Sequence, residues 1–120
     1  MSNILNLTQH AATPDQVQAG VVEPADKPAV STLLTFDTAP DQGELQRRAS
    51  ALAAMATNAG TPAAMIGGAP YLMAPLEKAL REAGVKPVYS FSERRSSEQT
   101  QPDGSVRKVN VFVHVGWVEA

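Results

Sequence analysis

The chain has 120 residues, 43% of them hydrophobic, and a formal net charge of −2. This length suits one globular domain with its own core, which we expect to span residues 1–120. The small net charge excludes binding of polyanions through bulk charge, so we expect no DNA partner. Because the chain has no cysteine and its two histidines are far apart in sequence, we predict no metal and no cofactor.

The N-terminal residues lack the basic flank and long apolar core of a signal peptide. No apolar run in the chain is long enough to span a bilayer. These two absences predict a cytoplasmic protein that has no membrane partner.

Residues 4–20 are predicted to form a strand, a polar turn and a short helix. Ile4–Leu7 is a short apolar run typical of a buried strand, and the polar turn Thr8–His10 follows it. Thr13 is predicted to cap the helix, with a proline in the first turn and Gln16 completing a capping box. A glycine is expected to end this helix.

The middle of the chain is predicted to contain a surface connection, a second strand and a long helix. Residues 20–31 are rich in proline and alanine and have no clean period, so they are interpreted as the connection. Residues 31–36 are interpreted as the strand. Asp41 is expected to cap a helix over residues 42–58, whose apolar positions recur at helical spacing.

A third strand, a glycine turn and a third helix are predicted next. Ala63–Ile66 is the strand, and Gly67–Pro70 is the turn. Proline lacks an N–H group and is tolerated only in the first turn of a helix. Pro75 therefore predicts that the third helix begins near Tyr71 or later.

The last third of the chain is predicted to form a fourth strand and a hairpin. Residues 86–92 are the strand, and residues 102–104 suit a three-residue hairpin loop. Valines alternate with other side chains over residues 108–115, which is typical of a strand. The whole order predicts a Rossmann-like α/β fold, with a mostly parallel sheet, flanking helices and a C-terminal antiparallel hairpin.

Ligands of open parallel sheets bind beyond the carboxyl ends of the strands, near the point where the strand order reverses. Polar turns follow the first, third and fourth predicted strands, and we expect them to converge in space. These turns are Thr8-Gln9-His10, Gly67-Gly68-Ala69 and Ser92-Glu93-Arg94-Arg95.

The glycine turn is a candidate anion site. Gly67 and Gly68 lack Cβ atoms, so a ligand can approach their backbone closely, and the N–H groups that begin the next helix favour an anion. The alternative is a tight turn without a ligand. The turn lacks the ending of a Walker loop and the full dinucleotide fingerprint.

Arg94 and Arg95 are planar donors suited to phosphate. Strand alternation places them on opposite faces, so we expect at most one to reach the ligand. The alternative is an exposed ion pair with Glu93 or Glu98, and Lys108 has the same two interpretations.

The imidazole of His10 can act as a general acid or base near neutral pH. The alternative is a surface or capping histidine. His114 shares a strand face with Lys108 and is expected to be a sheet histidine bonded to a neighbour.

One set of residues carries a family resemblance over nearly the whole chain. It comprises Thr13-Pro14-Asp15-Gln16, Gly67-Gly68-Ala69-Pro70, Tyr89-Ser90-Phe91-Ser92-Glu93-Arg94, Glu98, Asp103-Gly104, Lys108, Phe112-Val113-His114-Val115 and Trp117. This set resembles small CRISPR-associated proteins related to the CARF domain, which include stand-alone ring nucleases of CRISPR loci and phages.

The resemblance implies a CARF-like homodimer that holds one cyclic oligoadenylate, most commonly cyclic tetra-adenylate, on its two-fold axis. It implies metal-independent cleavage, in which a ribose 2′-OH attacks the neighbouring phosphate and leaves a 2′,3′-cyclic phosphate. By position, the Gly67–Gly68 turn holds phosphates and Arg94 stabilises charge. Thr8 and Gln9 line the ribose and base, and His10 is the acid or base. Ser92, Lys108 and Ala69 are further ligand-binding candidates.

The leading hypothesis is therefore a ring nuclease that switches off type III CRISPR signalling. The first alternative is a protein that sequesters or senses a cyclic nucleotide without cleaving it. The second is an unrelated small α/β protein that acts through protein contacts.

Overall fold

A computed structural model describes residues 3–120, and its central element is a five-stranded sheet of order β2-β1-β3-β4-β5. Strands β1 to β4 are parallel, and β5 is antiparallel to β4. The elements are β1 (Ile4–Leu7), α1 (Pro14–Gln18), β2 (Val21–Val22), α2 (Lys27–Leu34), α3 (Gln42–Ala59), β3 (Ala63–Ile66), α4 (Pro70–Glu82), β4 (Lys86–Thr100) and β5 (Val106–Glu119). A mixed α/β fold with a mostly parallel sheet and a C-terminal antiparallel pair is thus confirmed.

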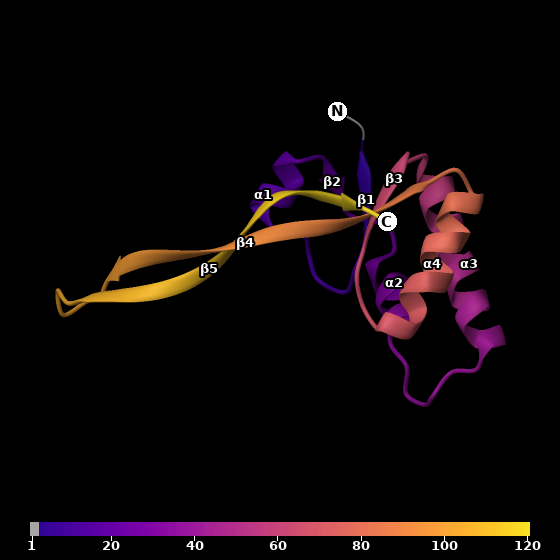
Figure 1. The fold of residues 1–120 in the computed structure, drawn as a ribbon, viewed down its shortest axis with the longest axis horizontal. Coiled ribbons are helices and arrows are strands. Elements are labelled where there is room, and N and C mark those ends of the chain that lie inside the picture. The colour runs from indigo at the N-terminus through magenta and orange to yellow at the C-terminus, as the bar shows by residue number, and fades with distance from the viewer. Residues whose placement is uncertain (1–2) are drawn as a thin grey trace.

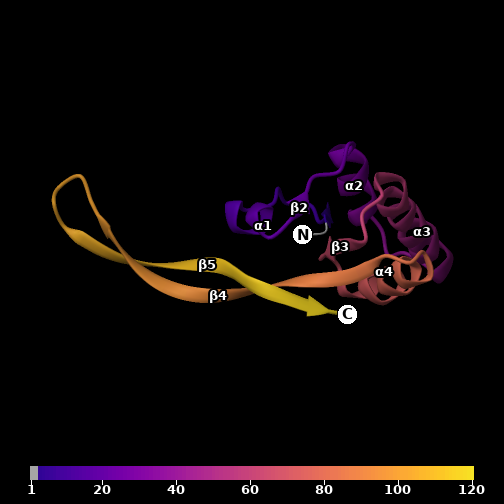
Figure 2. The ribbon, with the colours of Figure 1, turned by 90° about the horizontal axis from the view of Figure 1, so that it is seen from above.

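The molecule consists of two unlike parts. Residues 3–90 and 116–120 form the body, and residues 91–115 form a long two-stranded ribbon, here called the arm (Figure 1). The arm leaves the body on the side opposite α3 and α4, and its outer half has no other element beside it (Figure 2). The principal extents of 56 × 37 × 24 Å reflect this projection.

The main core lies between one face of the sheet and helices α2, α3 and α4. Alternation along β1 and β3 turns Leu5, Leu7, Ala64 and Ile66 toward these helices. The helices contribute an apolar stripe that is almost fully buried, including Val30, Leu34, Leu45, Leu52, Leu72, Leu76 and Leu80.

The opposite sheet face has a much smaller cluster. Ile4, Val21, Met65 and Val88 meet there, and Trp117 of β5 packs against them. Among residues 3–120, the short helix α1 and the chain that precedes it cover this face. The sheet is therefore thickly covered on one side and thinly covered on the other.

The predicted strand over residues 31–36 is wrong, because most of this segment belongs to helix α2. The Asp26 side chain accepts from the Ala29 N–H and caps this helix, and a proline lies in its first turn. Val30 and Leu34 are one helical turn apart and both are buried against α3. The second strand lies instead in the predicted connection, where Val21 and Val22 pair with β1.

The bounds of α4 and β4 also differ from the prediction. Helix α4 begins at Pro70 and contains Pro75 in its interior. Strand β4 runs on to Thr100, because β5 pairs with it from Val88 onward. The segment that begins at Ser92 therefore lies inside a strand and does not follow a strand end.

The remaining element predictions are confirmed. Thr13 caps α1 in a complete capping box, and Asp41 caps α3, which ends at Gly60 in the left-handed conformation. The hairpin turns over residues 102–104, where Gly104 has a φ of +88°. Within residues 3–120, none of the helices combines the length and apolarity that crossing a membrane requires.

Candidate binding cleft at the carboxyl ends of the parallel strands

A cleft of about 380 Å³ opens where the strand order reverses. Strand β2 lies on one side of β1 and β3 lies on the other, so the reversal falls between β1 and β3. The cleft is lined by Thr8, His10, Ala11, Thr13, Gln16, Met65, Ile66, Tyr89 and Ser90. This position is the one that open α/β sheets use for ligands. A depression of about 480 Å³ between α3 and α4 lies away from the strand ends and among exposed helix side chains.

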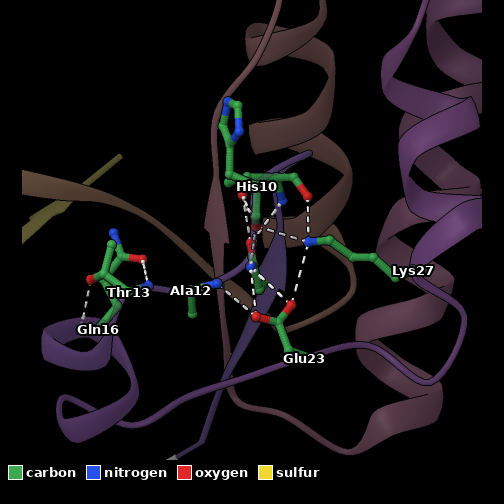
Figure 3. A network of polar contacts seen from close by, with 8 residues as sticks. His10, Ala12, Thr13, Gln16, Glu23 and Lys27 are labelled. Carbon is green, nitrogen blue, oxygen red and sulfur yellow. Dashed lines mark hydrogen bonds and ion pairs between the residues drawn. The ribbon is translucent and has the colours of Figure 1, made fainter.

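The turn after β1 is held by a network of polar contacts (Figure 3). Its centre is Asn6, which is fully buried. The Asn6 amide donates to the His10 carbonyl at 2.8 Å and to a Glu23 carboxylate oxygen at 3.0 Å. The Asn6 carbonyl oxygen accepts from the Thr8 N–H at 3.0 Å and from the Thr8 hydroxyl at 2.7 Å. All of the hydrogen-bonding capacity of this buried amide is thus used to shape the turn.

Glu23 and Lys27 hold the turn from the outside. Glu23 accepts from the Ala12 N–H at 2.7 Å, and the Lys27 ammonium lies 3.4 Å from its carboxylate. Lys27 also donates to the carbonyls of Thr8 and His10, at 2.7 and 3.1 Å. Partial burial acts to raise the pKa of Glu23, but the bond from Ala12 and the charge of Lys27 outweigh it and lower that pKa. Glu23 is therefore anionic at neutral pH.

The His10 imidazole is not part of this network. Only the His10 backbone carbonyl accepts bonds from Asn6, Thr8 and Lys27, while the ring stands clear of them (Figure 3). The ring is exposed and borders the cleft. Its backbone is thus fixed while its side chain stays available to a ligand.

Helix α1 closes the cleft over strand β4. The Gln16 amide donates to the Ser90 hydroxyl at 3.2 Å, and the same hydroxyl lies 2.6 Å from Nδ1 of His114. The His114 ring also packs against Trp117, with centroids 4.4 Å apart. His114 is thus a sheet histidine bonded to a neighbour, as the sequence predicts.

Tyr89 forms a fixed wall of the cleft. Its hydroxyl donates to the Glu77 carboxylate at 2.5 Å. Burial, followed by this hydrogen bond and the charge of Glu77, raises the pKa of Tyr89 far above its ordinary value. The phenol therefore stays protonated and directed at α4.

The glycine turn after β3 lies beside the turn after β1. A Cβ atom added to Gly67 would stand 3.6 Å from the Thr8 methyl group, and the φ of Gly68 is +149°. Ala69 is the N-cap of α4 and offers no side-chain bond to the helix. Pro70 has no N–H group, and the Leu72 N–H donates to the Ala69 carbonyl at 3.0 Å. At the start of α4, this leaves the Tyr71 N–H as the group that can bind a ligand.

The structure brings together some of the predicted site residues and separates others. Thr8 and His10 line the cleft, and Gly67 adjoins Thr8. The Gln9 side chain turns away and donates to the Thr35 hydroxyl at 2.8 Å.

Three predicted site residues lie on the arm and not at the carboxyl-end turns. Ser92, Arg94 and Lys108 stand opposite His114, Phe112 and Glu98 in the ribbon. The expected convergence of the third turn is therefore wrong, because β4 does not end at Ser92. Arg95 pairs with Glu93 at 3.4 Å, which is the ion pair given above as the alternative.

Within residues 3–120, no three His, Asp or Glu side chains lie close enough together to hold a metal ion. The sequence model of the Uncharacterized protein MJ1673 family matches residues 2–118. The chain belongs to this family. The matched range includes both the cleft and the arm. Comparisons with curated proteins and with solved structures give no match.

Several residues that line or support the cleft were not predicted from the sequence. Asn6 carried a signal, since one amide in an otherwise apolar strand must find partners when it is buried. Glu23 and Lys27 carried none, because they lie in a segment without a period and reach the turn only through the fold. Gln16 was recognised as a cap but not as a partner of Ser90.

Proposed function

We propose that this protein binds a cyclic oligoadenylate at the cleft and cleaves it as a metal-independent ring nuclease. The observation that carries the proposal is the meeting of the turns after β1 and β3 beside an uncommitted imidazole. Hydroxyl and amide groups at the rim of the cleft suit a ribose. A ring of several nucleotides exceeds one cleft of this size, which favours a homodimer.

The chemistry requires alignment, charge stabilisation and one proton transfer. The ribose 2′-oxygen forms a bond to the adjacent phosphorus, the bond from phosphorus to the 5′-oxygen breaks, and a 2′,3′-cyclic phosphate results. The proton of the 2′-OH leaves to water, and His10 in its protonated form donates a proton to the departing 5′-oxygen. In this mechanism, the N–H groups of the glycine turn and of Tyr71 stabilise the added negative charge. Cleavage of the signal would end type III CRISPR signalling.

A second candidate is binding without cleavage, as a sponge or sensor. One observation favours it: the residues that line the cleft within residues 3–120 include no lysine or arginine. Apart from His10, the described part of a single chain thus offers only backbone N–H groups to a transition state that carries extra charge.

One assay separates the two candidates. Purified protein is incubated with radiolabelled cyclic tetra-adenylate and EDTA, and the products are resolved against time. Linear products with a 2′,3′-cyclic phosphate support the nuclease, and an intact ligand that co-migrates with the protein supports the sponge. No interaction with rings of any size contradicts both.

The role of His10 is tested with a matched pair of variants. His10→Ala is expected to slow single-turnover cleavage about 100-fold or more, which is the usual contribution of a general acid. Gln9→Ala changes the neighbouring residue of the same turn, whose side chain faces Thr35, and is expected to retain most of the rate. Equal rates for both variants would remove His10 from the mechanism.

A further inference from the structure

The arm lacks the contacts that normally stabilise a β-ribbon. Strand β5 is the edge of the sheet along its whole length, and β4 pairs with β3 only over Lys86–Val88. In the outer half of the arm, both edges of the ribbon are open and both of its faces meet solvent (Figure 2). A two-stranded ribbon alone in water is marginally stable. The arm therefore requires a surface to pack against.

The side chains of the arm indicate that this surface is a protein. Phe112 is 71% exposed and Val106 is 60% exposed, both on the face that carries Arg94. Phe91 and Val111, on the other face, are 55% and 39% exposed. Large apolar side chains that are this exposed on one projecting ribbon are candidates for an interaction surface.

The charge of the arm is opposite to the charge of the body. The arm carries four basic and three acidic side chains: Arg94, Arg95, Arg107 and Lys108 against Glu93, Glu98 and Asp103. Because the whole chain has a net charge of −2, the arm is at +1 and the remainder is at −3. Among the ion pairs of residues 3–120, only Arg95 of these four basic side chains takes part. The arm is thus electrostatically complementary to another copy of the body.

The cleft lacks the basic side chains that the arm carries. Its lining residues within 3–120 include no lysine or arginine. In the same chain, Arg94 lies four residues beyond Ser90, which is about 13 Å along a strand. That distance exceeds the length of an arginine side chain, so Arg94 does not reach its own cleft.

We propose that the arm packs on a second copy of this chain, across its thinly covered sheet face, and places Arg94 in the cleft of that copy. A two-fold axis makes the arrangement reciprocal, so that both arms are covered and both clefts gain a cation. The nature of the bound anion rests on the proposed function. The association itself does not.

The association is tested first by mass. Sedimentation of the full chain is expected to give a dimer, about twice 12.7 kDa, at tens of micromolar. Phe112→Thr is expected to weaken dimerisation at least 10-fold. Val22→Thr, at a position on the far edge strand that is 36% exposed, should leave it unchanged. A monomeric unaltered chain would overturn the proposal.

The site of contact is tested by cross-linking, which is clean because the chain has no cysteine. Ser96→Cys on the arm and Asp15→Cys on α1 are purified separately, mixed and oxidised. The expected product is a disulfide between the two variants, whereas Lys78→Cys on α4 should give none with Ser96→Cys. If the only disulfide that forms joins two Ser96→Cys chains, the arms pair with each other. That result would overturn the proposed placement of the arm on the partner's sheet face.

The supply of Arg94 from the partner is tested by mixing His10→Ala with Arg94→Ala. Each variant alone is expected to be defective, while a mixed dimer contains one complete cleft. Random mixing should restore about a quarter of the unaltered rate. No recovery, when mass confirms mixed dimers, assigns Arg94 to its own chain or to neither site. If Ser96→Cys and Asp15→Cys form the expected mixed disulfide but the unaltered protein never cleaves, the nuclease proposal fails and the arm proposal stands.

Discussion

The turn after β1 and the arm are both built from polar side chains beside apolar ones, yet their contacts differ. In the turn, one buried amide, one carboxylate and one lysine hold the backbone through contacts within the same chain. In the arm, the side-chain contacts are sparse and exposed, such as the bond of 3.2 Å from Ser96 to Asn110. The turn therefore has its stabilising contacts within one chain, whereas the arm lacks such contacts.

This difference predicts where substitutions will be felt. Changes at the turn and its supporting core should alter the free energy of global unfolding. Changes on the arm should alter local opening and association, because few buried contacts tie the arm to the body. Four comparisons test this division.

The largest effect is expected for a core leucine compared with an arm aromatic. Leu76 is fully buried, so Leu76→Ala should lower the free energy of unfolding by about 2.5–5 kcal/mol. Phe112→Ala should change it by under about 0.5 kcal/mol in dilute, monomeric protein. Urea denaturation measures both. A cost above about 1 kcal/mol for Phe112→Ala in a monomer would show that the arm folds back on its own body.

Two asparagines provide the next comparison. Asn6→Asp removes the amide donor to the His10 carbonyl and places a second carboxylate beside Glu23. It should cost about 2–4 kcal/mol of unfolding free energy. Asn110→Asp keeps the acceptor for Ser96 at an exposed site and should cost under about 0.5 kcal/mol. Similar values for the two would contradict a special role for the turn network.

Two glycines with positive φ form a third pair. Alanine at Gly68, whose φ is +149°, or at Gly104, whose φ is +88°, should each cost about 1–2 kcal/mol locally. A Cβ atom added to Gly68 would stand 3.7 Å from Met73 and 3.8 Å from Leu34, so Gly68→Ala should lower global stability. Gly104→Ala should raise amide exchange only in the arm. Faster amide exchange throughout the body of Gly104→Ala would contradict the separation between the body and the arm.

The smallest effect is expected for Glu23. Its lowered pKa means that the carboxylate stabilises the fold above about pH 4.5, and that this contribution is lost as pH falls through the folded-state pKa. Glu23→Gln should cost about 0.5–1 kcal/mol at pH 7, after allowance for partial exposure. The cost should shrink toward pH 3 in urea denaturation at several pH values. Glu98→Gln on the arm should have almost no effect, and a pH-independent cost at Glu23 would contradict the assignment.

Local signals made much of the body predictable from sequence. The capping box of Thr13 and Gln16, the Asp41 cap and the apolar run of β1 each act within a few residues, so the sequence pattern matched the structure. The strand prediction for residues 31–36 was wrong because a short apolar run is compatible with a strand or a helix. Contact with α3 decided between them. The prediction missed strand β2, because its two residues form a strand only through their pairing with β1.

The candidate site was predictable only at the two turns that follow true strand ends. His10 and Gly67 were found because the ends of parallel strands meet at one edge of the sheet. The prediction placed Arg94 at a strand end, but the structure has it inside β4. Whether a polar strand stops or continues depends on its partner strand, and the partner β5 is more than ten residues away in sequence.

By itself, the sequence determined the alternation of strands and helices, the caps and the polar turn at His10, since these depend on neighbouring residues. The tertiary structure alone decided that Glu23 and Lys27 fix that turn and that β4 and β5 extend into an arm. Both depend on pairings between distant segments, whose free energy comes from burial and hydrogen bonding that no local pattern records.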